Sequence, residues 1–211
     1  METPMFHLSY DETSLVYEPA EDSFLLIDAL EADLETLKAI KPLICLELGS
    51  GTGIVITALA KALKKVRQSH YLAVDLNPLA CRVTKRISKE NCVDVDAIQM
   101  DLSSCIQSRN IIDIVVFNPP YVVTSSSEVT DVNSIYKAWA GGKHGREVME
   151  RVFKNIPQLL SDSGIFYLLV IKENEPEQII ETFRKLNMKG DIILERKIRG
   201  EHLYVLRFRK K

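Results

Sequence analysis

The chain has 211 residues, of which 46% are hydrophobic and 27% are charged, and its formal net charge is -2. This length favours one domain with a sizeable core, and the composition is that of a soluble globular protein. The slightly negative charge argues against a protein that binds duplex nucleic acid by itself, because neutralising phosphates requires an excess of Lys and Arg. It does not exclude a chain that borrows a basic surface from a partner.

The four cysteines predict neither a metal site nor a disulfide framework. They form no CxxC pair, have no histidine at ligand spacing, and include Cys45 inside an apolar run. A reducing compartment is therefore expected. Residues 1–10 lack a signal-peptide pattern, and no uncharged apolar run approaches the roughly 18 residues of a membrane span. We expect a cytosolic or nuclear protein that does not enter a membrane.

Residues 1–16 begin with a polar, aperiodic stretch and are predicted to form a flexible N-terminal arm, followed by a single domain over 17–211. Beyond the arm, the hydrophobic spacing alternates between helical and strand patterns. In chain order, the expected elements are a helix over Phe24–Leu37 that starts near Pro19, a strand over Leu43–Leu48, a helix over Ile54–Lys65, a strand over Tyr71–Val74, a helix over Pro78–Lys89, strands over Val95–Met100 and Ile111–Phe117, a helix over Arg146–Leu160, a strand over Gly164–Ile171, a helix over Glu175–Leu186, and strands over Ile192–Ile198 and His202–Phe208.

Strands that alternate with helices predict an α/β fold with a seven-stranded, mostly parallel, doubly wound sheet. The last two strands meet across Arg199–Glu201 and predict a C-terminal antiparallel hairpin. The strand over Val95–Met100 is expected at an edge of the sheet, where either a partner or a loop of the same chain could cover it. The connection from Val122 to Gly145 is long, and loops of that length in a compact domain are usually either functional or disordered.

Four polar residues close consecutive apolar runs: Glu47, Asp75, Asp101 and Asn118. In an open α/β sheet, ligands bind at the carboxyl ends of the strands, near the switch point of the topology. Polar residues are common at strand ends in any case, but four together favour a binding site.

The segment Gly49-Ser50-Gly51-Thr52-Gly53 directly follows the first strand and opens a helix. Its glycines allow close approach of a ligand to the backbone. The pattern is GxGxG, which differs from the GxGxxG of nicotinamide enzymes and from the phosphate loop. Asp75 ends the next strand, where a carboxylate can accept both ribose hydroxyls. Together these features predict an adenosine-containing ligand, and they leave a dehydrogenase open.

The segment Asn118-Pro119-Pro120-Tyr121 follows the fourth strand. Its two prolines remove two N–H donors and restrict the backbone. The Asn118 side-chain carbonyl and a proline carbonyl then form two acceptors that match the N–H bonds of a primary amide or an exocyclic amine, and Tyr121 offers a flat face. In isolation the tetrapeptide could be a rigid turn. After a strand of this sheet, it favours a site for a planar nitrogen.

These motifs resemble known families. Glu47 to Gly53 is similar to the donor-binding motif of class I methyltransferases, and Asn118 to Tyr121 to that of amino-methyltransferases. More specific matches lie at Tyr17–Leu26, Asn118–Thr124, Trp139–Met149 and Ile171–Asn174. Over nearly the whole chain, they resemble the catalytic subunits of HemK-like glutamine N5-methyltransferases of eukaryotic and archaeal class I release factors.

The resemblance implies a Rossmann-like class I methyltransferase fold and S-adenosylmethionine as the cofactor. It implies that the substrate is the glutamine of the Gly-Gly-Gln (GGQ) motif of a class I translation termination factor. It also implies a small zinc-binding activator subunit in a heterodimer, and no direct contact with nucleic acid or membrane. Carried over onto this sequence, the catalytic residues are Asn118, Pro119, Pro120 and Tyr121, and the cofactor-binding residues are Ser23, Glu47, Gly49, Gly51, Asp75, Asp101, Leu102 and Asn118.

Two other acceptors fit parts of this pattern. An adenine N6 of DNA or RNA is also a planar amine, but its methylation requires a flipped base and a basic surface. A protein lysine is a second alternative, although an ammonium must lose a proton first and no base is evident. A non-catalytic donor-binding module is opposed by the intact glycines and NPPY segment.

Overall fold

The computed structural model describes residues 1–107, 109–129 and 138–211. Its strands are β1 (Ile44–Leu48), β2 (His70–Asp75), β3 (Asp96–Gln99), β4 (Ile112–Phe117), β5 (Leu160–Ile171), β6 (Met188–Ile198) and β7 (Glu201–Lys210). Its α-helices are α1 (Tyr10–Thr13), α2 (Glu21–Ala32), α3 (Leu34–Ile40), α4 (Ile54–Leu63), α5 (Pro78–Glu90), α6 (Ser126–Val129), α7 (Glu150–Phe153), α8 (Ile156–Leu159) and α9 (Pro176–Lys185), and short 3-10 turns lie at η2 (Lys143–Gly145) and η3 (Lys172–Asn174).

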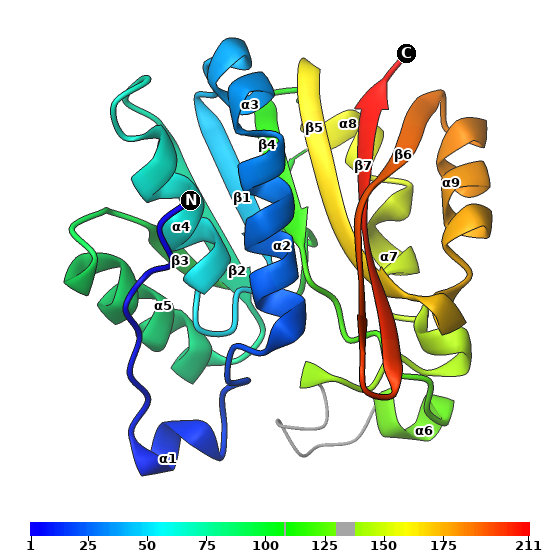
Figure 1. Ribbon diagram of the computed structural model, residues 1–211, viewed down its shortest axis with the longest axis horizontal. Coiled ribbons are helices and arrows are strands. Elements are labelled where there is room, and N and C mark those ends of the chain that lie inside the picture. Colours follow the sequence, from blue (N-terminus) through cyan, green and yellow to red (C-terminus); the bar gives the residue numbers. More distant parts are fainter. Residues whose placement is uncertain (108, 130–137) are drawn as a thin grey trace.

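The seven strands form one sheet in the order β3-β2-β1-β4-β5-β7-β6 (Figure 1). Strands β1 to β5 pair in parallel, whereas β7 is antiparallel to both β5 and β6. The predicted fold class is therefore confirmed, including the C-terminal hairpin and the edge position of β3. The strand order reverses between β1 and β4, which makes their carboxyl ends the switch point of the topology.

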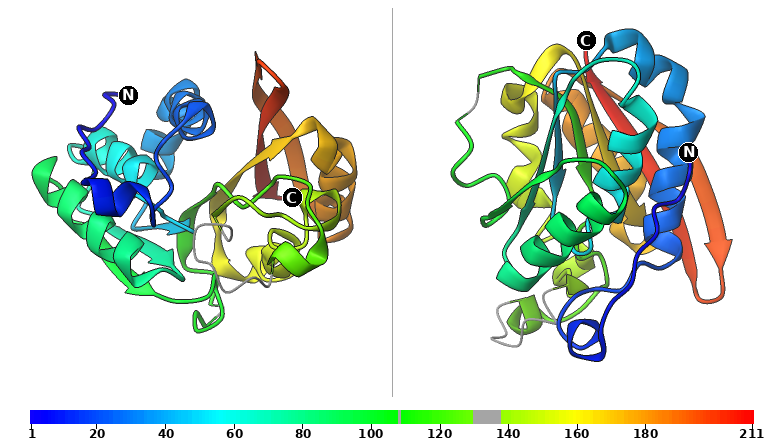
Figure 2. Two further views of the ribbon diagram at one scale, coloured as in Figure 1. Left: turned by 90° about the horizontal axis from the view of Figure 1, so that it is seen from below. Right: turned by 90° about the vertical axis from the view of Figure 1, so that its left-hand side faces the viewer.

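Two hydrophobic cores lie on opposite faces of the sheet. One joins α2 and α4 to inward residues of the strands such as Cys45 and Ile114, and the other joins α7, α8 and α9 to residues such as Leu46 and Val115. Successive residues of β1 and β4 thus alternate between the two cores, as the pleat of a strand requires. Figure 2 shows these helices on either side of the curved sheet. None of the helices in the described ranges is long and apolar enough to cross a bilayer.

Two helices that the sequence predicts as continuous are each divided in the structure, so these two predictions were wrong. The helix expected over Phe24–Leu37 is divided into α2 and α3 at Asp33, whose backbone leaves the helical region. The helix expected over Arg146–Leu160 consists of the short helices α7 and α8, and Leu160 already belongs to β5. Pro157 lies in the first turn of α8 and lacks the N–H that a continuous helix would need.

The N-terminal segment runs along α5 at the end of the sheet that carries α6 (Figure 1). Val16 is buried against α5, and the Asn91 side chain bonds both the N–H and the carbonyl of Met5. That residues 1–16 form a flexible arm stays a prediction. Of the long connection from Val122 to Gly145, residues 130–137 lie outside the described part of the chain, and the rest includes α6 and η2.

Candidate active site

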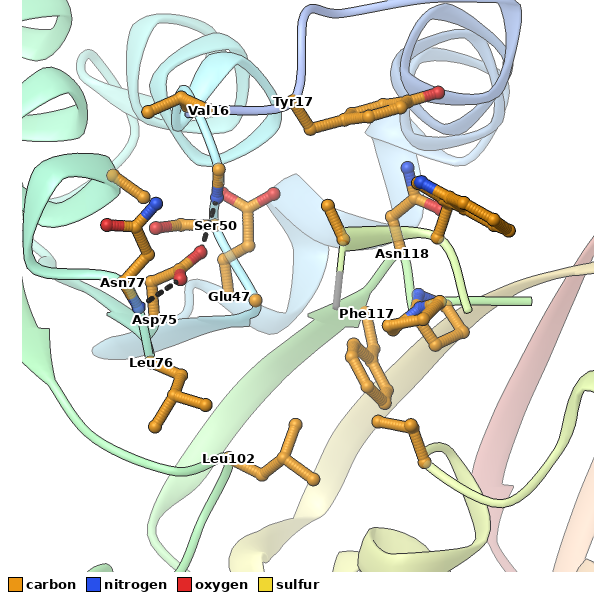
Figure 3. Close-up of a pocket in the computed structure, with 18 of the residues that line it drawn as sticks. Val16, Tyr17, Glu47, Ser50, Asp75, Leu76, Asn77, Leu102, Phe117 and Asn118 are labelled. Atoms are coloured by element: carbon orange, nitrogen blue, oxygen red, sulfur yellow. Dashed lines mark hydrogen bonds between the residues drawn. The ribbon is translucent and has the colours of Figure 1, made fainter. Parts of the chain in front are cut away.

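A cavity of about 640 Å³ opens at the carboxyl ends of β1, β2 and β4. Its volume lies within the range of small-molecule sites. Figure 3 shows Tyr17 and Leu102 on opposite sides of this cavity, with Asp75 and Asn118 facing each other across it. The walls combine apolar side chains with a small number of acids and amides. The cavity is therefore suited to a ligand that has both apolar surface and hydrogen-bonding groups.

The glycine-rich loop after β1 forms the floor on one side of the cavity. Gly49, Gly51 and Gly53 all have positive φ, which residues with a Cβ adopt only with strain. A Cβ on Gly53 would also lie 2.5 Å from a methyl carbon of Thr84 on α5. The loop and α5 thus pack closely because Gly53 has no side chain. Near Gly51, the nearest atom to an added Cβ is a carbonyl 4.0 Å away, so the space above the loop is open.

Asp75 joins this loop to the end of β2. One of its carboxylate oxygens accepts the N–H of Gly51 at 2.8 Å, and the other accepts the N–H of Asn77 at 2.8 Å (Figure 3). Burial raises the pKa of Asp75, and the two backbone N–H groups oppose that shift. The carboxylate can still accept hydroxyl groups from a ligand through its remaining lone pairs.

Glu47 is the most deeply buried acid of the site, at 2% exposure. Its carboxyl accepts the N–H of Ile56 at 3.1 Å, near the start of α4. Burial raises the pKa of Glu47 to about 8; the N–H of Ile56 lowers this pKa and the nearby charge of Asp75 raises it. A cationic group of a ligand beside Glu47 would stabilise the charged form.

The opposite wall is built by the NPPY segment and by Asp22 at the start of α2. The Asp22 carboxylate accepts hydrogen bonds from the Asn118 amide at 3.0 Å, the Tyr17 hydroxyl at 2.9 Å and the Tyr121 hydroxyl at 3.2 Å. Burial, together with the adjacent Asp22, raises the pKa of both tyrosines, which stay neutral donors. The Asn118 side-chain oxygen is buried and has no hydrogen-bond partner within the described ranges. That oxygen is available to a substrate.

Asn174, which is fully buried at the end of η3, attaches the NPPY segment to the fold. Its amide nitrogen donates to the carbonyls of Tyr121 at 2.8 Å and His144 at 2.9 Å, and its oxygen accepts the N–H of Ile171. Gly145 lies so close to the Tyr121 carbonyl that a Cβ there could not be placed without displacing backbone. The glycine-rich segment after Trp139 is thus packed directly against the NPPY backbone.

The structure places all the predicted site residues on this one cavity. Its lining includes Ser23, Glu47, Gly49, Gly51, Asp75, Asp101, Leu102, Asn118, Pro119, Pro120 and Tyr121. Asp101 is the most solvent-accessible of the acids and pairs with Arg151 at 2.6 Å. Their binding and catalytic roles stay predictions.

Sequence reasoning did not assign roles to Asp22, Tyr17 or Asn174. Tyr17 and Asp22 lie in the same matching segment as Ser23, and Asn174 ends another such segment. The signal was therefore present in the sequence. The hydrogen bonds of Asp22 with Asn118 and Tyr121 span 96 and 99 residues, and that of Asn174 with Tyr121 spans 53, so only the fold reveals them. Trp139, which begins another matching segment, also lines the cavity.

The family model "Methyltransferase small domain" matches residues 22–190. A human protein, Methyltransferase HEMK2, is 44% identical over 97% of this chain and 94% of its own length. A Methanocaldococcus jannaschii protein named as a protein N5-glutamine methyltransferase is 34% identical over 90% of each chain. The solved Mtq2–Trm112 complex of E. cuniculi, described as responsible for methylating the eRF1 translation termination factor, is similar with a TM-score of 0.69, 30% identity, and coverage of 93% of this chain and 99% of that one.

Because the pKa of Glu47 is raised, the stability of the chain should depend on pH in a defined direction. Between an unfolded pKa near 4.3 and the folded value of about 8, the folded chain holds a proton that the unfolded chain has released. This group therefore lowers the free energy of unfolding as pH rises, by about 1.4 kcal/mol per pH unit. Glu47→Gln should remove that component in urea unfolding at about pH 5.5 and pH 7.5. The exposed Glu35→Gln should keep it, and equal slopes for wild type and Glu47→Gln would contradict the assignment.

Proposed function

This chain belongs to the methyltransferase small domain family, and on that premise we propose that it methylates a glutamine side-chain amide with S-adenosylmethionine as the methyl donor. The proposed substrate is the glutamine of the GGQ motif of the class I translation termination (release) factor. The observation that carries the proposal is the unpartnered, buried Asn118 side-chain oxygen, held beside a cavity of donor size. The names of the similar proteins support the same substrate. The four free cysteines support a cytosolic or nuclear location.

The residues of the cavity fit S-adenosylmethionine. Asp75 would accept hydrogen bonds from the ribose hydroxyls. Glu47 and the open glycine loop at Gly49 and Gly51 would hold the methionine part, and the adenine ring would lie on the side of the cavity that carries Asp101 and Leu102. Ser23 lines the same cavity from α2. When bound, the donor supplies an electrophilic methyl group on a positively charged sulfur. Buried carboxylates around it favour a cation.

The acceptor side of the reaction uses Asn118 and Pro119. A glutamine nitrogen is a weak nucleophile because its lone pair is delocalised. The Asn118 side-chain oxygen and the Pro119 carbonyl accept hydrogen bonds from the two N–H groups of this nitrogen and hold both on one side. The nitrogen is then more pyramidal, and its lone pair points along the line of methyl transfer. As the N–C bond forms, the bond between the donor's sulfur and the methyl group breaks, and the positive charge passes from sulfur to the nitrogen beside these acceptors. The nitrogen then releases one proton to water, and the donor leaves as a neutral thioether. Positioning of this kind can supply about 7–11 kcal/mol.

The proposed partner is a small zinc-binding activator subunit that covers the β3 edge of the sheet. The similar E. cuniculi structure is a complex with Trm112, which supports a small partner. Within the described residues, β3 pairs with β2 alone, and Ile98 on β3 is 42% exposed. A bare edge strand with an exposed apolar side chain is a surface that a partner stabilises by covering it.

The assay that tests the function uses the chain co-purified with its activator subunit. The wild type should methylate a release factor that contains GGQ, and should not methylate that factor after its GGQ glutamine is replaced by alanine. Methylation of an adenine-containing DNA or of a lysine-containing tail in place of the release factor would overturn the proposal. Asn118→Ala should lower the rate of transfer by about 10²–10³-fold or more, and should weaken donor affinity in calorimetry by a much smaller factor. Equal loss of both properties would assign Asn118 to folding.

Asp75→Ala should weaken donor binding, because it removes the proposed ribose acceptor and releases the Gly51 and Asn77 N–H groups. We expect a rise in the donor dissociation constant of about tenfold or more, which corresponds to about 1.4 kcal/mol. Asp162→Ala, at the opposite end of the sheet, is the control and should leave binding unchanged. Calorimetry with an unchanged constant for Asp75→Ala would remove Asp75 from the donor site.

The partner surface is tested by two matched substitutions on opposite edges of the sheet. Ile98→Lys on β3 should prevent co-purification of the activator subunit, since a lysine would be buried without a partner. Ile192→Lys on β6 should have no effect, although Ile192 is exposed to nearly the same degree, 40%. Retention of the subunit by Ile98→Lys and its loss from Ile192→Lys would move the interface to the other edge.

A further inference from the structure

We infer that Asp22 is the positioning residue that sets the orientation of the Asn118 side-chain amide. In this orientation the oxygen of Asn118, and not its nitrogen, faces the substrate glutamine. The inference rests on the proposed function for its chemistry, and on the hydrogen bonds of Asp22 for its geometry. Asp22 itself is 3% exposed, in the first turn of α2.

Every hydrogen-bond partner of the Asp22 carboxylate in the described part of the chain is a donor. One oxygen accepts the backbone N–H of Ser23 at 2.6 Å and the Ser23 hydroxyl at 3.2 Å. The other accepts the hydroxyls of Tyr17 and Tyr121 and the amide nitrogen of Asn118 at 3.0 Å. A carboxylate offers acceptors only, so it pairs with the NH₂ end of the Asn118 amide and would repel the oxygen end.

The two ends of an asparagine side chain have almost the same shape, and only their hydrogen bonds distinguish them. With its nitrogen held by Asp22, Asn118 must direct its oxygen the other way. That oxygen is one of four buried side-chain atoms that have no hydrogen-bond partner in the described part of the chain, and it is the one of the four that belongs to the NPPY segment. If the amide turned over, Asn118 would present N–H donors to the N–H donors of the substrate glutamine. No hydrogen bond could form between them, and the site would no longer hold the glutamine nitrogen.

Asp22→Asn tests this orientation with little change of shape. The new amide must keep its oxygen on the Ser23 N–H, because that backbone donor cannot rotate away. Its NH₂ group then faces Asn118, which has to turn over and accept. The hydroxyls of Tyr17 and Tyr121 can rotate to suit either arrangement, so they do not oppose the turn.

An exchange of the two residues supplies the rescue. In Asn118→Asp alone, two carboxylates face each other across the 3.0 Å contact and repel. In the double variant Asp22→Asn/Asn118→Asp, the amide at 22 donates to the carboxylate at 118. The second oxygen of that carboxylate then faces the substrate glutamine, as the Asn118 oxygen does in the wild type. The total charge of the pair is also unchanged.

The experiment compares the wild type, both single variants, the double variant and Asp28→Asn, each co-purified with the activator subunit. Asp28 lies on α2 outside the site, where it pairs with Arg196, and its variant should keep wild-type kcat. Asp22→Asn should lower kcat on a GGQ-containing release factor by about 10²–10³-fold, while the donor dissociation constant stays within a few-fold of wild type. The double variant should exceed Asn118→Asp in kcat by about tenfold or more, and should also regain the melting temperature lost in Asn118→Asp.

The inference is overturned if Asp22→Asn keeps wild-type kcat, or if the double variant recovers neither turnover nor melting temperature relative to Asn118→Asp. A purely structural role for Asp22 would lower donor binding and stability in Asp22→Asn and would not be rescued at position 118. A wild type without activity on the release factor would sink the proposed function alone, because recovery of the melting temperature in the double variant tests the pairing without any substrate.

Discussion

The register of β1 with its two neighbours is the constraint on which the site depends. Leu48 pairs with Val74 of β2 on one side and with Phe117 of β4 on the other. The residues that follow these three therefore leave the sheet side by side: the glycine loop, Asp75 and Asn118. A slip of one residue in either pairing would turn the side chains of a strand to the opposite face and separate the donor and acceptor halves. Burial of β1 and β4 on both faces specifies that register.

A second constraint is the cluster of carboxyl groups that lie around the cavity. Asp22 and Glu47 are buried and Asp75 is half-buried, and burial raises the pKa of Glu47 and of Asp75. Such groups destabilise a fold unless donors reach them. Backbone N–H groups of loops and first helical turns reach all three, so the same bonds that satisfy the acids also fix the shape of the loops. A ligand with a positive charge adds a further favourable interaction that the unliganded fold lacks.

The order of elements and the strand ends could be predicted from the sequence because both depend on local periodicity. Asp75 and Asn118 each close an apolar run, and the topology of parallel strands brings such ends together. The break at Asp33 was missed because tertiary packing decides whether a short helical pattern continues. The break before Pro157 had a local signal, the proline itself, which the expected helix over Arg146–Leu160 disregarded. Asp22 and Asn174 lie in segments that match the family, but the match does not show which polar residues of those segments contact the NPPY segment. Their importance comes from partners that lie far along the chain.

The donor and acceptor halves differ in how they are built, and this difference bears on where substrate choice resides. The donor half consists of strand ends and the glycine loop, whose geometry the sheet register determines. The acceptor half is assembled from three segments far apart in sequence: Asp22 on α2, Asn118 after β4 and Asn174 after β5. Asp22 and Asn174 attach the NPPY segment through their side chains and not through sheet pairing. The NPPY segment matches planar nitrogens in general, and the direction in which Asn118 presents its amide decides whether it can accept a hydrogen bond from any of them, so the choice among them resides beyond this residue. A single buried carboxylate that accepts the NH₂ end sets that direction, and this makes Asp22 as much a part of the acceptor site as the atoms that touch the substrate.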